Sequence, residues 1–325
     1  MNKVHSDGVK STLSFSEKEN RCRITFDNCL RNGRRFYHLC TPGEVQQIVF
    51  CSKDDYEAGM LIAAISLKAF PGLRIITFEI MSNHIHFILL GTKEEVEAFF
   101  SLFKSKLQRF LKNDGRVVDL SRFTANIIEI NDLEALRNQI VYTNRNNYVV
   151  DSDNTPFTYP YGANGYYFFP TFSIVGGIRF EELTIRERRS LLRSHDIDYP
   201  GDYLVVGNYF SPACFCSISL GESMFRDARH YFHKISREIE SYKTVAAIVG
   251  DSIFYTDDEL LSVVYGICRK DYGGQKPALL TASDKIELAR TMHFDYNANN
   301  GQIARMLKVP IATIESLFPR REMAR

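Results

Sequence analysis

Two kinds of apolar pattern follow one another along the first half of the chain: short apolar runs, and longer stretches in which apolar residues recur with helical spacing. The short runs cover residues 35–40, 73–80 and 84–90 and predict β-strands. Only residues 81–83 separate the second run from the third, so these two strands are expected to form a hairpin.

Longer stretches repeat apolar residues every three or four positions and predict helices. Residues 54–70 and 132–148 have this spacing. A further helix is expected to begin after Thr92, because Glu95 three residues later completes a capping box. Strands and helices alternate here, so the pattern predicts a domain that contains both.

Three segments follow from these patterns. Residues 1–20 are mostly polar and are expected to form a flexible arm. Residues 21–175 hold the alternating strands and helices, and the pattern of residues 176–325 is mainly helical. The sequence therefore predicts a domain of strands and helices followed by a mainly α-helical C-terminal domain.

Residues 299–318 have the pattern of a helix-turn-helix at the C-terminal end. Ile303 and Leu307 are expected in its interior, which would give the two helices a small core of their own. A tight turn is expected near Lys308, where a glycine is usual, and Arg305 and Lys308 would lie on a basic outer surface that contacts DNA. A helical hairpin that only closes the C-terminal domain is the alternative.

The charge balance changes which nucleic-acid contacts are expected. The formal net charge is +1 and the isoelectric point is about 7.6. The chain therefore lacks the overall basic field of a non-specific nucleic-acid binder, and DNA contact must come from local patches. The helix after Thr92 carries one such patch, made of Lys104, Lys106, Arg109 and Lys112.

The cysteines and the hydropathy indicate the compartment. The chain has seven cysteines, an odd number, and no C-x-x-C pair, so we expect reduced thiols. The first twenty residues lack an apolar leader, and no apolar run reaches membrane-spanning length. The sequence thus predicts a soluble, cytoplasmic protein without a membrane partner.

His84 and His86 are the first candidates for site chemistry. They are two positions apart in a predicted strand, so both side chains leave the same face of the sheet. Two imidazoles on one face can chelate a divalent cation, and burying them without a partner would be unfavourable. Two half-exposed histidines on a sheet surface are the alternative interpretation.

The residues around this pair resemble a known motif. The run MSNHIH at residues 81–86 is similar to the M-P-N-H-[VI]-H strand motif of insertion-sequence and REP-associated single-tyrosine transposases. In that family it is the HUH element, histidine–hydrophobic–histidine. Ser82 stands where the family usually has proline, a change in the turn before the histidines.

Two later segments extend the resemblance over roughly residues 30–170. Tyr142, with Asn146 four residues on, is similar to the family's Y-I-x-x-N-P-V segment, although Asn147 replaces its proline. Residues 159–161, Tyr-Pro-Tyr, are similar to the family's Y-P-W segment. Residues four apart share a helix face, so Tyr142 and Asn146 would point the same way.

The resemblance implies a metal-dependent tyrosine transposase whose residues 21–175 form a domain of the α+β class, with a ferredoxin-like antiparallel sheet and helices. Tyr142 would be the nucleophile, and His84, His86 and Asn146 would hold Mg²⁺ or Mn²⁺. The partner would be single-stranded DNA able to form a hairpin, and a homodimer is one assembly left open. The cation would offset the phosphate charge, and the tyrosine would keep the cut end as a phosphotyrosine ester that can be rejoined.

Other interpretations stay open at this stage. A domesticated, catalytically silent DNA-binding protein on the same fold is the alternative function, although the presence of all four site residues together favours the enzyme. Tyr148, near the end of the same helix, is the alternative nucleophile. A histidine-triad hydrolase is excluded, because its H-x-H-x-H motif would need a histidine at Ile88.

Overall fold

The computed structural model describes most of the chain. The described residues are 13–42, 48–116, 118–150, 159–169, 176–236, 257–294, 296, 298 and 300–318. No helix within these ranges is both long enough and apolar enough to cross a membrane.

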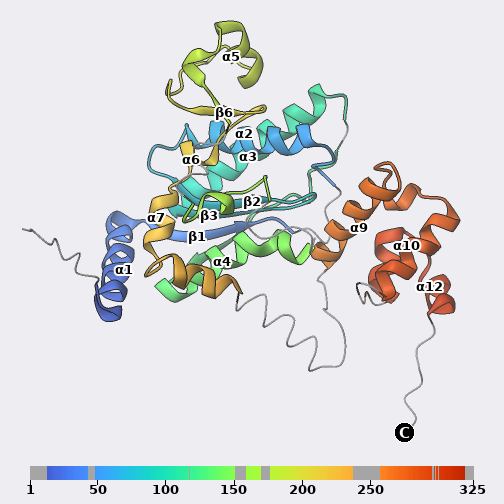
Figure 1. Ribbon diagram of the computed structural model, residues 1–325. Coiled ribbons are helices and arrows are strands. Elements are labelled where there is room, and N and C mark those ends of the chain that lie inside the picture. The colour runs from blue at the N-terminus through green and yellow to red at the C-terminus, as the bar shows by residue number, and fades with distance from the viewer. Residues whose placement is uncertain are drawn as a thin grey trace, which may run out of the picture.

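A four-stranded antiparallel sheet lies at the centre of the first half (Figure 1). Its strands are β1 (Arg35–Cys40), β2 (Arg74–Ile80), β3 (Ile85–Gly91) and β4 (Asn126–Ile130), in the spatial order β2-β3-β1-β4. The three strands expected from the short apolar runs are confirmed, and β2 and β3 form the expected hairpin.

Helices α2 (Lys53–Leu67) and α3 (Lys93–Asn113) cover one face of the sheet (Figure 1). Thr92 caps α3, and the predicted capping box with Glu95 is confirmed. Phe87 of β3 packs with Phe99 of α3 in the core on this face, with a ring-centroid distance of 5.4 Å.

Helices α1 (Phe15–Cys29) and α4 (Leu133–Val150) lie on the opposite face. Phe26 of α1 stacks on Phe36 of β1 at 5.5 Å between ring centroids. The expectation of a flexible arm over residues 1–20 is therefore wrong from Phe15 onward. Ser14 forms a capping box with Glu17, and the helix buries Cys22 and Phe26 in the second core.

A small three-stranded sheet follows and packs over α2. It consists of β5 (Ile178–Arg179), β6 (Leu204–Val206) and β7 (Tyr209–Phe210), with α5 (Ile185–Leu192) between the first two strands. Helices α6 (Pro212–Phe215) and α7 (Ile218–Ser223) and a helical stretch at residues 228–236 come next. Short 3₁₀ turns lie at Arg31–Gly33, Asn164–Tyr166, Phe180–Glu182 and Pro277–Leu279.

Hydrophobic packing continues across residue 175, where the sequence analysis placed a domain boundary. Phe180 and Phe210 belong to the core under α2 and α3, and Phe225 and Tyr231 belong to the core under α4. Residues 178–235 therefore complete the α+β domain, because they fill cores that the first half begins.

The C-terminal region is a helical bundle with a third core. Its helices are α9 (Asp257–Asp271), α10 (Ala282–Phe294), α11 (Asn300–Leu307) and α12 (Ile311–Leu317). Contacts between α9 and α4 join the bundle to the α+β domain (Figure 1).

Helices α11 and α12 match the two expected C-terminal helices. The tight turn near Lys308 is confirmed, since its φ of 52° is left-handed and allows the chain to reverse within the turn. The expectation of a separate small core is wrong: Ile303 and Leu307 pack in one cluster with Leu260 of α9 and Leu288 of α10.

Candidate metal and tyrosine site

Polar side chains lie in register across the sheet face that α4 covers. His86 of β3 pairs with Cys40 of β1 on one side and with Glu79 of β2 on the other. Directly opposed residues of antiparallel strands point to the same face, so these three form one row. His38 lies two positions before Cys40 and on the same face. We call these four residues the polar row.

The two histidines of the motif are close together and buried, as the strand spacing predicts. The rings of His84 and His86 lie 5.0 Å apart between centroids and are nearly perpendicular. Their exposed fractions are 5% and 6%, so the alternative of two half-exposed surface histidines is wrong.

Hydrogen bonds orient both imidazoles. The Nδ1 of His84 lies 2.8 Å from the Oδ1 of Asn83, and an amide oxygen only accepts, so the ring donates from Nδ1. A neutral imidazole then keeps its lone pair on Nε2. The Nδ1 of His86 lies 3.0 Å from the Nε2 of His38, so these two rings share one proton between them. A hydrogen bond at one ring nitrogen, such as that of His84 to Asn83, commonly orients a histidine that binds metal through its other nitrogen.

Burial keeps these imidazoles neutral. It lowers the pKa of His38 and of His84 from the ordinary 6.5 to about 4. The pKa of His86 is lowered well below 6.5, first by burial and then by repulsion from the charged forms of His84 and His38. The neutral form is the one that binds metal, so the site is ready to take a cation at neutral pH.

His38, Cys40 and His86 can together hold a metal ion. Their ligand atoms all lie within 4.8 Å of one another. Two imidazole nitrogens and a thiol sulfur suit a borderline-soft ion better than Mg²⁺, which prefers oxygen ligands. His38 and Cys40 were not predicted from the sequence, although their spacing repeats that of His84 and His86. The pairing of β1 with β3 cannot be predicted from either strand alone.

Tyr142 of α4 lies directly above these histidines. Its ring centroid is 5.7 Å from that of His86 and 6.0 Å from that of His38, both in edge-on geometry. The guanidinium of Arg145 lies 5.5 Å from the Tyr142 ring centroid. Tyr142 is 36% exposed, so a ligand from solvent can reach the tyrosine beside the buried imidazoles.

A closed set of hydrogen bonds holds α4 over the sheet. Thr77 of β2 donates to the Oδ1 of Asn144 in α4. The Nδ2 of Asn144 donates to the Tyr231 hydroxyl at 2.7 Å, and that hydroxyl donates to the Oδ1 of Asn164 at 2.6 Å. The Nδ2 of Asn164 donates to the backbone oxygen of Asn144 at 2.9 Å, which closes the set. Tyr142, two residues earlier in the helix, is thereby fixed over the polar row.

The remaining predicted ligand and the alternative nucleophile stay untested. Asn146 and Tyr148 lie in α4, but their side chains are outside the described residues. The assignment of Asn146 as a ligand therefore remains a prediction that rests on its place in the helix.

The predicted DNA-binding residues do not gather around Tyr142. The basic residues of α3 lie on the other face of the sheet, because α3 packs with α2 and the core there. Arg305 and Lys308 are exposed, but they belong to the C-terminal bundle. The basic residues of α3 are Lys104, Lys106, Arg109 and Lys112.

Comparisons of the chain with protein-family models, with curated proteins and with solved structures found no match.

A change of pH should report the buried, neutral state of His38. Its pKa of about 4 is below the unfolded value of 6.5, so the unfolded chain binds more protons between these values. The free energy of unfolding should fall as the pH drops from 6.5 to 4, by about 1.4 kcal/mol per pH unit for each such histidine. His38→Phe should reduce this slope by roughly that amount in urea titrations without metal.

The matched control for this titration is His195→Phe, which removes an imidazole that is exposed on the surface. An equal slope in wild type and His38→Phe would show that the pKa of His38 is not lowered by burial in the folded protein.

Metal titration should show whether sulfur is a ligand. Co²⁺ bound by thiolate gives a near-ultraviolet charge-transfer absorption that imidazole ligands do not give. We expect this band in the wild type and its loss in Cys40→Ser, because Cys40 lies within ligand distance of His38 and His86. His86→Ala should lose Co²⁺ binding.

Cys51→Ser is the control, since Cys51 is an exposed thiol outside the polar row. The contrary result is tight Co²⁺ binding without the band, where the binding is lost in His84→Ala and kept in Cys40→Ser. It would show that the ion binds at the predicted His84 and His86 pair.

Proposed function

We propose that this chain is a metal-dependent transposase that cuts and rejoins single-stranded DNA with Tyr142 as nucleophile. The single observation that carries the proposal is a partly exposed tyrosine in edge contact with His38 and His86, which are buried and neutral. The resemblance of residues 81–86 and of the helix around Tyr142 to HUH transposases supports the same assignment.

The topology also supports the proposal. The chain order β1, α2, β2, β3, α3, β4 and the spatial order β2-β3-β1-β4 agree with a ferredoxin-like fold. That fold is the one implied by the resemblance. Fold alone does not establish function, so the assignment depends on the site.

The chemistry is an exchange of one phosphoester for another. The Tyr142 hydroxyl loses its proton as its oxygen attacks the scissile phosphorus. The bond from phosphorus to the 3′ oxygen breaks, and that oxygen takes up one proton as a free 3′-hydroxyl, so the proton count is unchanged. The 5′-phosphate stays on Tyr142 as an ester, so the energy of the phosphodiester is kept. A later 3′-hydroxyl can then displace the tyrosine and reseal a strand.

The residues of the polar row would hold the divalent cation. When bound, this ion would neutralise part of the phosphate charge and stabilise the leaving oxygen. His38, Cys40 and His86 are the described ligand set. His84, His86 and Asn146 are the set implied by the resemblance. His86 belongs to both. The sulfur of Cys40 favours a borderline-soft ion, and Mn²⁺ fits the second set better than Mg²⁺ does.

A DNA-binding protein without cleavage activity is the second candidate. Exposed Arg305 and Lys308 on a helical pair with a tight turn favour it, since such a pair can contact DNA by itself. In that case the polar row would be a structural remnant or a metal-stabilised core.

Tyr142→Phe should abolish covalent attachment to single-stranded DNA. The change removes one oxygen and keeps the ring, so its packing against His38 and His86 should persist. Labelled hairpin DNA with a single-stranded flank, incubated with Mn²⁺, should give a denaturation-resistant adduct with the wild type and none with the variant. Binding of the same DNA in native gels should be unchanged.

The matched control is Tyr37→Phe, which removes a tyrosine oxygen on the other face of β1. It should keep the adduct. An adduct that survives in Tyr142→Phe rules out this nucleophile, whereas DNA binding without any adduct in all three proteins favours the non-cleaving candidate.

A further inference from the structure

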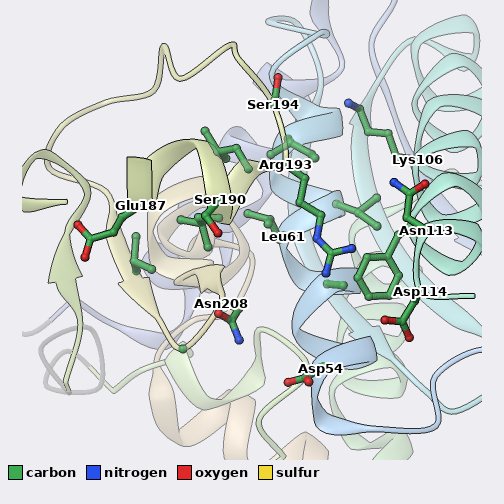
Figure 2. A pocket seen from close by; sticks show the side chains of 18 of the residues that line it. Asp54, Leu61, Lys106, Asn113, Asp114, Glu187, Ser190, Arg193, Ser194 and Asn208 are labelled. Atoms are coloured by element: carbon green, nitrogen blue, oxygen red, sulfur yellow. The ribbon is translucent and has the colours of Figure 1, made fainter. Parts of the chain in front are cut away.

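The pocket between α2, α3 and the unit formed by α5 and the small sheet does not adjoin the proposed reaction site. It has a volume of about 840 Å³ and lies on the side of the sheet away from Tyr142 (Figure 2). Side chains of both charges line it, since Asp114 and Glu187 accompany Lys106 and Arg193. A surface that recognises DNA beside the cleaved bond must therefore lie on the other face, which holds Tyr142.

Strand β4 lies beside the polar row at the edge of the sheet. In the register of β4 with β1, Asn126 pairs with Cys40 and Ile128 pairs with His38. Directly opposed residues of antiparallel strands point to the same face, so both side chains lie on the face of the polar row. Neighbouring strands are about 4.8 Å apart, so Asn126 and Ile128 each lie one strand spacing from a residue of the metal site.

The β4 side of the polar row is the side that is open to solvent. Glu79, at the other end of the row on β2, is only 3% exposed, and α4 packs mainly against β2 and β3. The exposure rises toward β4, where Cys40 is half-buried, Asn126 is exposed and Ile128 is 49% exposed. A DNA strand that brings a phosphate to Tyr142 therefore has room for the neighbouring base over β4, and not over β2.

The two exposed side chains of β4 suit the face and the edge of a nucleobase. Ile128 offers apolar surface to a base plane, and its partner His38 lies 6.0 Å from Tyr142 between ring centroids. The side-chain amide of Asn126 makes no hydrogen bond within the described part of the chain, so its donor and its acceptor are both available. An asparagine amide forms two hydrogen bonds with adenine, because it accepts from the amino group and donates to a ring nitrogen.

We propose that Asn126 is a specificity-determining residue that selects adenine next to the scissile phosphate. This inference rests on the proposed cleavage by Tyr142. With the phosphate at Tyr142, the neighbouring base lies on Ile128 and its edge meets the Asn126 amide. The strand spacing between His38, under Tyr142, and Ile128 matches the step from a phosphate to its own base. Neither β4 residue takes part in the chemical step, so their effect is on which strand is cut.

A binding selection with the Tyr142→Phe variant tests the base contact apart from cleavage. Hairpin DNA with a randomised single-stranded flank is incubated with the full chain and Mn²⁺, and the bound DNA is sequenced. One flank position should favour adenine by about fivefold or more, the discrimination expected from a pair of hydrogen bonds to one base. In the wild type, the same position should adjoin the phosphate that becomes attached to Tyr142.

Substitutions on β4 identify the side chain that reads the base. Asn126→Ala should lose the preference for adenine, and Asn126→Asp should shift it to cytosine, because a carboxylate accepts from the cytosine amino group. Ile128→Ala should weaken the binding of all four bases by about threefold or more and keep their order, since it removes apolar contact with the base face. The matched control is Asn113→Ala, which removes an exposed amide at the end of α3 in the pocket of Figure 2 and should change neither property.

This proposal and the cleavage proposal fail in different ways. An adenine preference that Asn126→Ala removes, without any covalent adduct in the wild type, would contradict cleavage by Tyr142 and still support the contact of Asn126 with adenine. The specificity proposal is overturned if the flank does not bind, if no position favours adenine, or if Asn126→Ala keeps the preference. It is also overturned if the preferred adenine lies away from the bond that the wild type cuts.

Discussion

The pairing of β1 and β2 with β3 is the constraint on which the site depends. Antiparallel register places Cys40 and Glu79 on either side of His86, so each of the three strands contributes one polar side chain to the same small area of the sheet. The opposite face of the same strands carries Leu39 and Phe87 in an apolar core. A shift of one residue in this register would turn the polar row into that core, at a high cost in desolvation.

A buried polar row restricts what can cover it. Helix α4 meets this need through Asn144, whose hydrogen bonds with Thr77, Tyr231 and Asn164 tie together elements from four parts of the chain. Tyr231 comes from beyond residue 175, so the second half of the chain helps to fix the helix over the site. Tyr142 owes its place above His86 to this network as much as to the sequence around it.

Local signals predicted local structure well. The capping box at Thr92 and Glu95 involves residues within one helical turn, and the proximity of His84 and His86 follows from the two-residue period of a strand. The proximity of Tyr142 to this pair could be anticipated only from the order of motifs. His38 and Cys40 were missed because strand register is a long-range property.

Long-range packing also determines features that the local patterns do not predict. Lys106 and Arg109 have the spacing of a basic helix surface, but only the tertiary structure shows that α3 lies on the face away from Tyr142. The helix at Phe15–Cys29 has few apolar residues, and its stability depends on packing Phe26 against Phe36 of β1. Likewise, α11 and α12 were expected to have a core of their own, because the residues of α9 and α10 that pack against them lie far away in the sequence.

The most direct test of the central claim is to find which residue carries DNA after cleavage. Single-stranded DNA with a short cleavable segment would be incubated with the wild-type protein and Mn²⁺, the protein digested, and the nucleotide-bearing peptide sequenced by mass spectrometry. The account predicts a 5′-phosphate esterified to the hydroxyl of Tyr142. A covalent nucleotide on Tyr148 or on any other residue would contradict it.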